Sequence, residues 1–99
     1  MSREKLSSQE IAEALGALAG WEMADESTAI EKTFRFSGFP QAFGFMAECA
    51  LFAEKIDHHP EWSNVYRTVV VKLSTHSAKG LTKLDFDLAA FMDKAASHH

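Results

Sequence analysis

The 99-residue chain has one cysteine, two prolines, five scattered glycines and no long apolar run. The lone cysteine, Cys49, excludes an intramolecular disulfide, and its apolar neighbours predict a small buried thiol. The apolar runs fall short of the ~18 residues of a membrane-spanning helix, and the polar first residues do not resemble a signal peptide. The scattered glycines exclude a glycine-rich phosphate loop. We therefore expect a soluble, cytoplasmic protein with no membrane partner.

Basic residues are also scarce. Ten Lys and Arg stand against fourteen Asp and Glu, which gives a net charge of −4. Because a duplex-binding protein normally carries a basic surface, we expect no direct nucleic-acid partner. The 46% hydrophobic content is typical of a folded chain. We expect one domain over residues 1–99, with frayed ends at 1–6 and 97–99, and a core small enough to gain stability from oligomer formation.

The hydrophobic pattern predicts an α+β fold. The expected elements are a helix over residues 8–19, strands at 21–23 and 30–36, a helix over 40–57, a strand over 65–75 and a helix beginning at 82. Capping boxes, Ser7 with Glu10 and Thr82 with Asp85, mark the start of the first and last helices. The order α-β-β-α-β-α predicts an antiparallel sheet with the helices packed on one face.

The helix over 40–57 is apolar on two sides. One stripe comprises Phe39, Phe43, Met46, Ala47 and Ala50, and the other Phe45, Cys49, Phe52 and Ile56. Such a helix needs two packing partners. One is the sheet; the other is either a sister helix of a second subunit or, for Phe45 and Phe52, the first helix.

Histidines provide the candidate chemistry. His58, His59 and His76 lie where predicted elements end, which is where a scaffold presents functional side chains. His98 and His99 end the printed sequence, and we assign them no role. Zinc binding by the first three is disfavoured, since adjacent imidazoles point apart and no H-E-x-x-H spacing or cysteine pair is present.

Two interpretations of these histidines remain. One histidine at a helix end can simply donate to a backbone carbonyl, although this explains three together poorly. Alternatively, imidazoles transfer protons, because their unperturbed pKa of about 6.5 lets them act as acid or base near neutrality. The sequence offers no nucleophile system, since Ser77 does not lie in a nucleophile elbow and Cys49 lies mid-helix.

Around these histidines the sequence resembles the pterin-4a-carbinolamine dehydratases (4a-hydroxytetrahydrobiopterin dehydratases). The central match is EKIDHHPEWSNVY at residues 54–66. Further matches are Gly20-Trp21, FRF at 34–36, AFGFM at 42–46, LSTH at 73–76, GLT at 80–82, Asp85 and Leu88-Ala89. The combination of D-H-H-P-E-W with a downstream S-T-H is specific, whereas H-H-P alone would not be.

The resemblance implies a reaction and a set of residues. The family dehydrates 4a-hydroxytetrahydropterin to quinonoid dihydropterin in tetrahydropterin recycling, with no metal or other cofactor. His58 and His76 would transfer protons, and His59 would bind and orient the ring. The implied substrate-binding residues are His58, His59, Pro60, Thr75, His76, Ser77 and Ala78. Glu54, Asp57 and Asp85 would support the histidines.

The resemblance also implies a homotetramer or dimer, built through sheet edges and the long helices. One position departs from the family, because many relatives carry Arg where this chain has Leu84, directly before Asp85. This leaves the charge state and role of Asp85 open. The alternative function is a non-catalytic protein-binding module, like a transcription cofactor, on the same fold.

Overall fold

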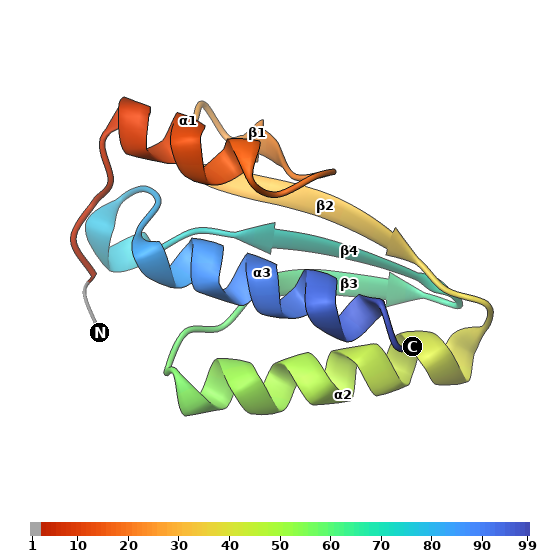
Figure 1. Cartoon of the computed structure of the whole chain (residues 1–99). Coiled ribbons are helices and arrows are strands. Elements are labelled where there is room, and N and C mark those ends of the chain that lie inside the picture. Colours follow the sequence, from red (N-terminus) through yellow and green to blue (C-terminus); the bar gives the residue numbers. More distant parts are fainter. Residues whose placement is uncertain (1–2) are drawn as a thin grey trace.

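The computed structural model describes residues 3–99 and confirms the α+β class. Along the chain run α1 (Ser8–Gly16), β1 (Glu22–Ala24), β2 (Ala29–Arg35), α2 (Phe39–Lys55), β3 (Glu61–Val65), β4 (Thr68–Leu73), a 3-10 turn (His76–Ala78) and α3 (Lys83–Ala96). The four strands form one antiparallel sheet in the order β1-β2-β4-β3. Helices α2 and α3 lie side by side along this sheet (Figure 1). Both predicted capping boxes are present.

The predicted single strand over residues 65–75 is wrong in one respect: it is the second half of a hairpin. Strand β3 ends at Val65 and β4 begins at Thr68, so the order contains one more strand than expected. The two-residue turn lacks the usual glycine, and Tyr66 takes a positive φ of 53° instead. The Asn64 side chain holds the turn by donating to the carbonyls of Tyr66 and Thr68 at 3.0 and 2.9 Å.

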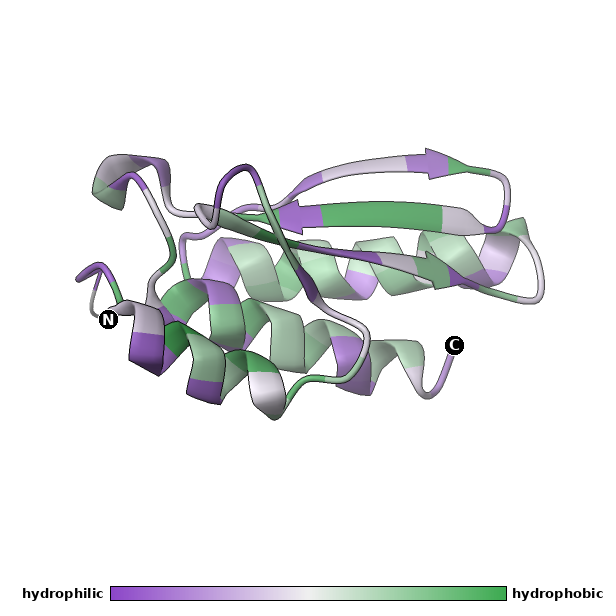
Figure 2. Cartoon of the chain, turned by 90° about the horizontal axis from the view of Figure 1, so that it is seen from above, coloured by the Kyte–Doolittle hydropathy of each residue, from purple (hydrophilic) through white to green (hydrophobic). Residues whose placement is uncertain are grey.

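The core lies between the sheet and the two long helices. Val69, Val71 and Leu73 of β4 are buried, while Val70 on the other face is 36% exposed. Figure 2 shows this apolar stretch as the green middle strand. Alternation of this kind places one face of an antiparallel sheet on the core and leaves the other to solvent.

The two apolar stripes of α2 differ in their burial. Phe45 is buried against Phe34 and Phe36 of β2, with ring centroids 4.8 and 4.9 Å apart, and Cys49 is buried as predicted. Phe52 stacks on Phe91 of α3 at 4.1 Å. The suggested contact with the first helix is therefore wrong, because α3 occupies that position.

The other stripe of α2 faces solvent. Phe39 and Phe43 are 46% and 58% exposed, and Leu51, on the same helix, is 76% exposed.

No helix within residues 3–99 is both long and apolar enough to cross a bilayer.

Candidate functional site

The end of α2 delivers the first two histidines. Asp57 adopts a left-handed φ of 53°, and the amides of Asp57 and His58 donate to the carbonyls of Glu54 and Ala53. These are the two bonds of a Schellman motif, in which a left-handed residue ends the helix. The motif turns the chain by a fixed angle, so the position of His58 follows directly from the helix end.

The third histidine comes from the end of β4. Thr75 and Gly80 exchange backbone hydrogen bonds at 2.9 and 3.4 Å and so close a loop that contains the 3-10 turn His76–Ala78. Lys79 completes the loop with a left-handed φ of 55°. His76 therefore projects from a short closed loop, exposed to solvent, beside the end of α2.

The three histidines line one cavity of about 300 Å³. Its lining residues are Arg3, Asp57, His58, His59, Ser74, Thr75, His76 and Ser77. Six of these residues are predicted from the sequence, whereas Arg3 and Ser74 are not. Pro60 and Ala78, which the resemblance implied, are not among the lining residues. Glu54 and Asp85 do not line the cavity either, but each contacts one of its histidines.

Below the cavity, His58 belongs to a buried polar network. Its Nε2 lies 2.6 Å from Oδ1 of Asp85, and the two residues are 6% and 0% exposed. The other oxygen of Asp85, Oδ2, accepts from the Thr75 hydroxyl at 2.8 Å and from the Thr82 amide at 2.9 Å. The Thr75 and Thr82 hydroxyls lie 2.8 Å apart, so all four residues are linked.

This network determines where the proton of His58 lies. Two donors already point at Oδ2 of Asp85, so its carboxylate acts as an acceptor and Nε2 of His58 donates to Oδ1. In residues 3–99, no buried side-chain nitrogen or oxygen is without a hydrogen-bond partner. His58 lines the cavity and its Nε2 is engaged by Asp85, so we infer that Nδ1 is the ring nitrogen available to the cavity. A neutral His58 thus presents a lone pair there.

Asp85 is also the N3 residue of the capping box that begins α3. One carboxylate therefore holds the helix start and orients the histidine. Leu84 is 1% exposed in the core, so the position at which the resemblance implied Arg contributes packing here, and the ring that contacts Asp85 is that of His58.

The remaining candidates lie at the rim. Nε2 of His59 lies 2.8 Å from Oε1 of Glu54, and both side chains are mostly exposed. Asp57 contacts Arg3 instead of a histidine: Nη2 of Arg3 donates to the Asp57 carbonyl at 2.7 Å. Asp57 thus acts through its backbone conformation, and Arg3 adds a cation at the mouth of the cavity.

The segment before α1 is anchored as well as lining the cavity. The Leu6 amide donates to the Leu81 carbonyl at 2.9 Å. These contacts connect Arg3 and Leu6 to the rest of the fold. Fraying at 1–6 and 97–99 stays a prediction, and its first two residues lie outside the described part of the chain.

A second cavity, of about 400 Å³, adjoins the first and shares Ser74, Thr75 and His76 with it. Its other walls carry Lys72, whose ammonium donates to Asp25 at 2.8 Å. That hydrogen bond raises the pKa of Lys72. Because its charges already neutralise each other, this cavity is a weaker candidate for catalysis than the cavity that contains three imidazoles.

The fold is that of a small α+β protein, and its candidate site is a cavity lined by three histidines. The family model described as pterin 4 alpha carbinolamine dehydratase matches residues 4–95. The chain therefore belongs to the pterin-4a-carbinolamine dehydratase family.

Individual proteins that resemble this chain carry pterin dehydratase names. A Sinorhizobium fredii protein, provisionally named a pterin-4-alpha-carbinolamine dehydratase, is 57% identical over 97 residues, which cover 98% of this chain and 92% of that protein. The crystal structure of a transcriptional coactivator/pterin dehydratase from Brucella melitensis is 50% identical, with a TM-score of 0.91 over 94% of this chain and 99% of that one.

A more distant structure shares the fold alone. It is a pterin dehydratase-like protein identified as a RuBisCO assembly factor in the alpha-carboxysome. It is 20% identical, with a TM-score of 0.68 over 78% of this chain and 89% of that one. Membership of the fold thus does not by itself define an activity.

Proposed function

We propose that this protein dehydrates 4a-hydroxytetrahydropterin to quinonoid dihydropterin in tetrahydropterin recycling. The observation that carries the proposal is the shared cavity of His58, His59 and His76 in a chain that belongs to this family. A cavity of about 300 Å³ is at the small end of the range for ligand pockets, which suits a flat bicyclic ring.

The reaction needs only proton transfers. The bond between C4a and its hydroxyl oxygen breaks, a proton joins the oxygen, and water leaves. The proton on N5 departs, and a double bond forms between C4a and N5. No electron is gained or lost overall, so an acid and a base on either side of the ring are sufficient.

His58 is the residue best prepared to accept a proton. Its Nε2 proton is held by Asp85, so its Nδ1 lone pair is directed to the cavity, and the carboxylate stabilises the imidazolium that forms. His76, which lines the same cavity, would protonate the leaving hydroxyl. His59, tethered by Glu54, and Arg3 would orient the ring at the rim.

The test follows the decay of 4a-hydroxytetrahydropterin, produced chemically or by a hydroxylase, with and without protein. We expect acceleration above the spontaneous reaction, and His76→Ala should lower it by up to ~10²-fold. His76 is exposed, so this variant should fold normally. The Glu13→Ala variant, altered on α1, should match the wild-type protein. Absence of acceleration by the wild-type protein would exclude the proposal.

The exposed apolar side chains of α2 favour self-association as a second property. Phe43 and Leu51 are 58% and 76% exposed on a helix whose other side is in the core. We propose that a second copy covers them in a homo-oligomer. Sedimentation analysis should show a dimer or tetramer that Leu51→Glu disrupts. A wild-type monomer at micromolar concentration would refute this, and loss of oligomer without loss of rate would separate it from catalysis.

A further inference from the structure

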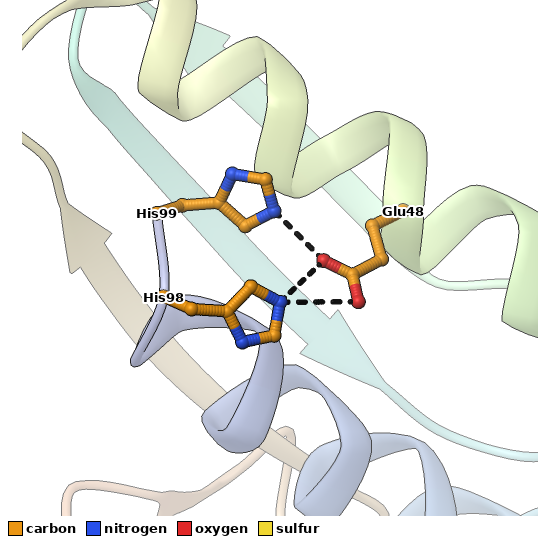
Figure 3. A group of neighbouring side chains, drawn as sticks. All are labelled: Glu48, His98 and His99. Carbon is orange, nitrogen blue, oxygen red and sulfur yellow. Dashed lines mark hydrogen bonds and ion pairs between the residues drawn. The ribbon is translucent and has the colours of Figure 1, made fainter.

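A second group of histidines lies far from the cavity. Glu48 projects from the middle of α2 toward His98 and His99, which follow the end of α3 (Figure 3). Nε2 of His98 lies 2.9 and 3.3 Å from the two carboxylate oxygens, and Nε2 of His99 lies 2.7 Å from Oε1. All three ligand atoms lie within 4.8 Å of one another.

The packing of α2 against α3 builds this cluster. The amides of His98 and His99 donate to the carbonyls of Ala95 and Ala96, so the last turn continues and brings both rings to the same side. Ala95 is buried and fixes that turn against the core. The side chain of His99 is 24% exposed and that of Glu48 is 34% exposed.

Gly44 makes room for one of the rings. It lies one helical turn before Glu48, and a Cβ there would stand 3.2 Å from both Cε1 and Nδ1 of His99. A Cβ at this position would therefore require the imidazole to shift by a few tenths of an ångström. The absence of a side chain at position 44 allows the present close approach of the His99 ring to α2.

The donor set has the chemistry of a metal site. Two imidazoles and one carboxylate are ligands that Zn²⁺ accepts at about 2.0–2.2 Å, with ligand atoms roughly 3.4 Å apart in a tetrahedron. The present distances from the two Nε2 atoms to the Glu48 oxygens, 2.7–3.3 Å, are slightly shorter than that spacing. Metal binding therefore requires small side-chain rotations and the transfer of each Nε2 proton to Nδ1 or to solvent.

We propose that Glu48, His98 and His99 bind one divalent transition-metal ion of the zinc type, which joins α2 to the end of α3. Three protein ligands leave a fourth position for water. The site is separate from the histidine cavity, since Asp85 and His98 are thirteen residues apart along α3 and its extension, or about 20 Å. The inference does not depend on the proposed dehydratase activity.

The test is a titration of metal-free protein, without any affinity tag, with ZnCl₂. We expect saturable binding of one equivalent and a rise in Tm with zinc concentration, because a ligand that binds only the folded state stabilises it. Glu48→Gln and His99→Gln should each weaken binding by roughly tenfold or more. Asp87→Asn, an acidic residue of α3 outside the cluster, should bind zinc normally.

Gly44→Ala gives a test that preserves all three ligands. Alanine favours a helix interior over glycine, so this variant should fold at least as well, yet bind zinc more weakly because the His99 ring must shift. Failure of the wild-type protein to bind zinc would overturn the proposal. Wild-type affinity in Glu48→Gln, or loss of binding in His76→Ala instead, would also overturn it.

Discussion

Replacing Asp85 by asparagine tests the buried network beneath the histidine cavity. Asp85→Asn keeps the shape of the side chain but replaces one acceptor oxygen by a donor amide. If the amide group faces His58, Nε2 must lose its proton and Nδ1 must carry it. If it faces the Thr82 amide instead, two donors meet at the present 2.9 Å and the capping bond is lost.

The magnitude follows from three hydrogen bonds. Each bond to a charged acceptor is about 1 kcal/mol stronger than a neutral one, so the three bonds of Asp85 account for about 3 kcal/mol. Burial of a neutral amide costs less than burial of a carboxylate, which offsets part of this loss. We expect a destabilisation of about 1–3 kcal/mol, measured by urea unfolding.

Activity should fall as well. With the proton on Nδ1, His58 no longer offers a lone pair to the cavity, and we expect kcat to fall by ~10- to 100-fold. KM should change little, because Asp85 is not a lining residue of the cavity. Asp87→Asn is the matched control, since Asp87 only pairs with Lys83 near the surface of the same helix.

Two measurements test this prediction: the kcat of Asp85→Asn and the tautomer of His58. ¹⁵N NMR of the histidine rings should show the His58 proton on Nε2 in the wild-type protein. A folded Asp85→Asn protein that keeps the wild-type kcat would refute the role given to Asp85. A wild-type spectrum with the proton on Nδ1 would refute the derivation of the tautomer itself.

Four further predictions concern the core and the missed hairpin. Burial raises the pKa of Cys49 to about 12, so the native thiol should react with alkylating reagents at least ~10³-fold more slowly than in urea; equal rates would contradict this. The same pKa shift means that, as pH rises, the Cys49 thiol loses its proton in the unfolded chain before it does so in the folded protein. The free energy of unfolding should therefore fall above pH ~9, and a Cys49→Ala variant should not show this pH dependence. Phe52→Leu and Phe91→Leu should show a coupling of about 0.5–1.5 kcal/mol in a double-mutant cycle, and additive effects would argue against the stack. Asn64→Ala removes two side-chain hydrogen bonds and should cost about 1–2 kcal/mol in urea unfolding; an unchanged midpoint would show that the turn does not depend on them.

The sequence predicted those parts of the fold whose signals are local. Both capping boxes and the burial of Cys49 depend on neighbouring residues, and the structure confirms them. The hairpin between β3 and β4 was missed because its turn contains Tyr66 and Arg67, neither of which is a usual turn residue. Asn64 was the available signal, but its role depends on a side chain that reaches across the turn.

For the candidate site too, some features could be predicted from the sequence and others could not. The convergence of His58 and His76 could be expected because both follow element ends that meet at one edge of the fold. The contribution of Arg3 could not be foreseen, since it depends on the path of the segment before α1 across the molecule. The tether between His58 and Asp85 spans 27 residues, and periodicity carries no information about such a contact.

A crystal structure with an oxidised pterin analogue bound would test the central claim most directly. We expect the bicyclic ring between His58 and His76, with Nδ1 of His58 within hydrogen-bond distance of a ring atom. A ring seated instead in the neighbouring cavity beside Lys72, or contacting none of the three histidines, would contradict it.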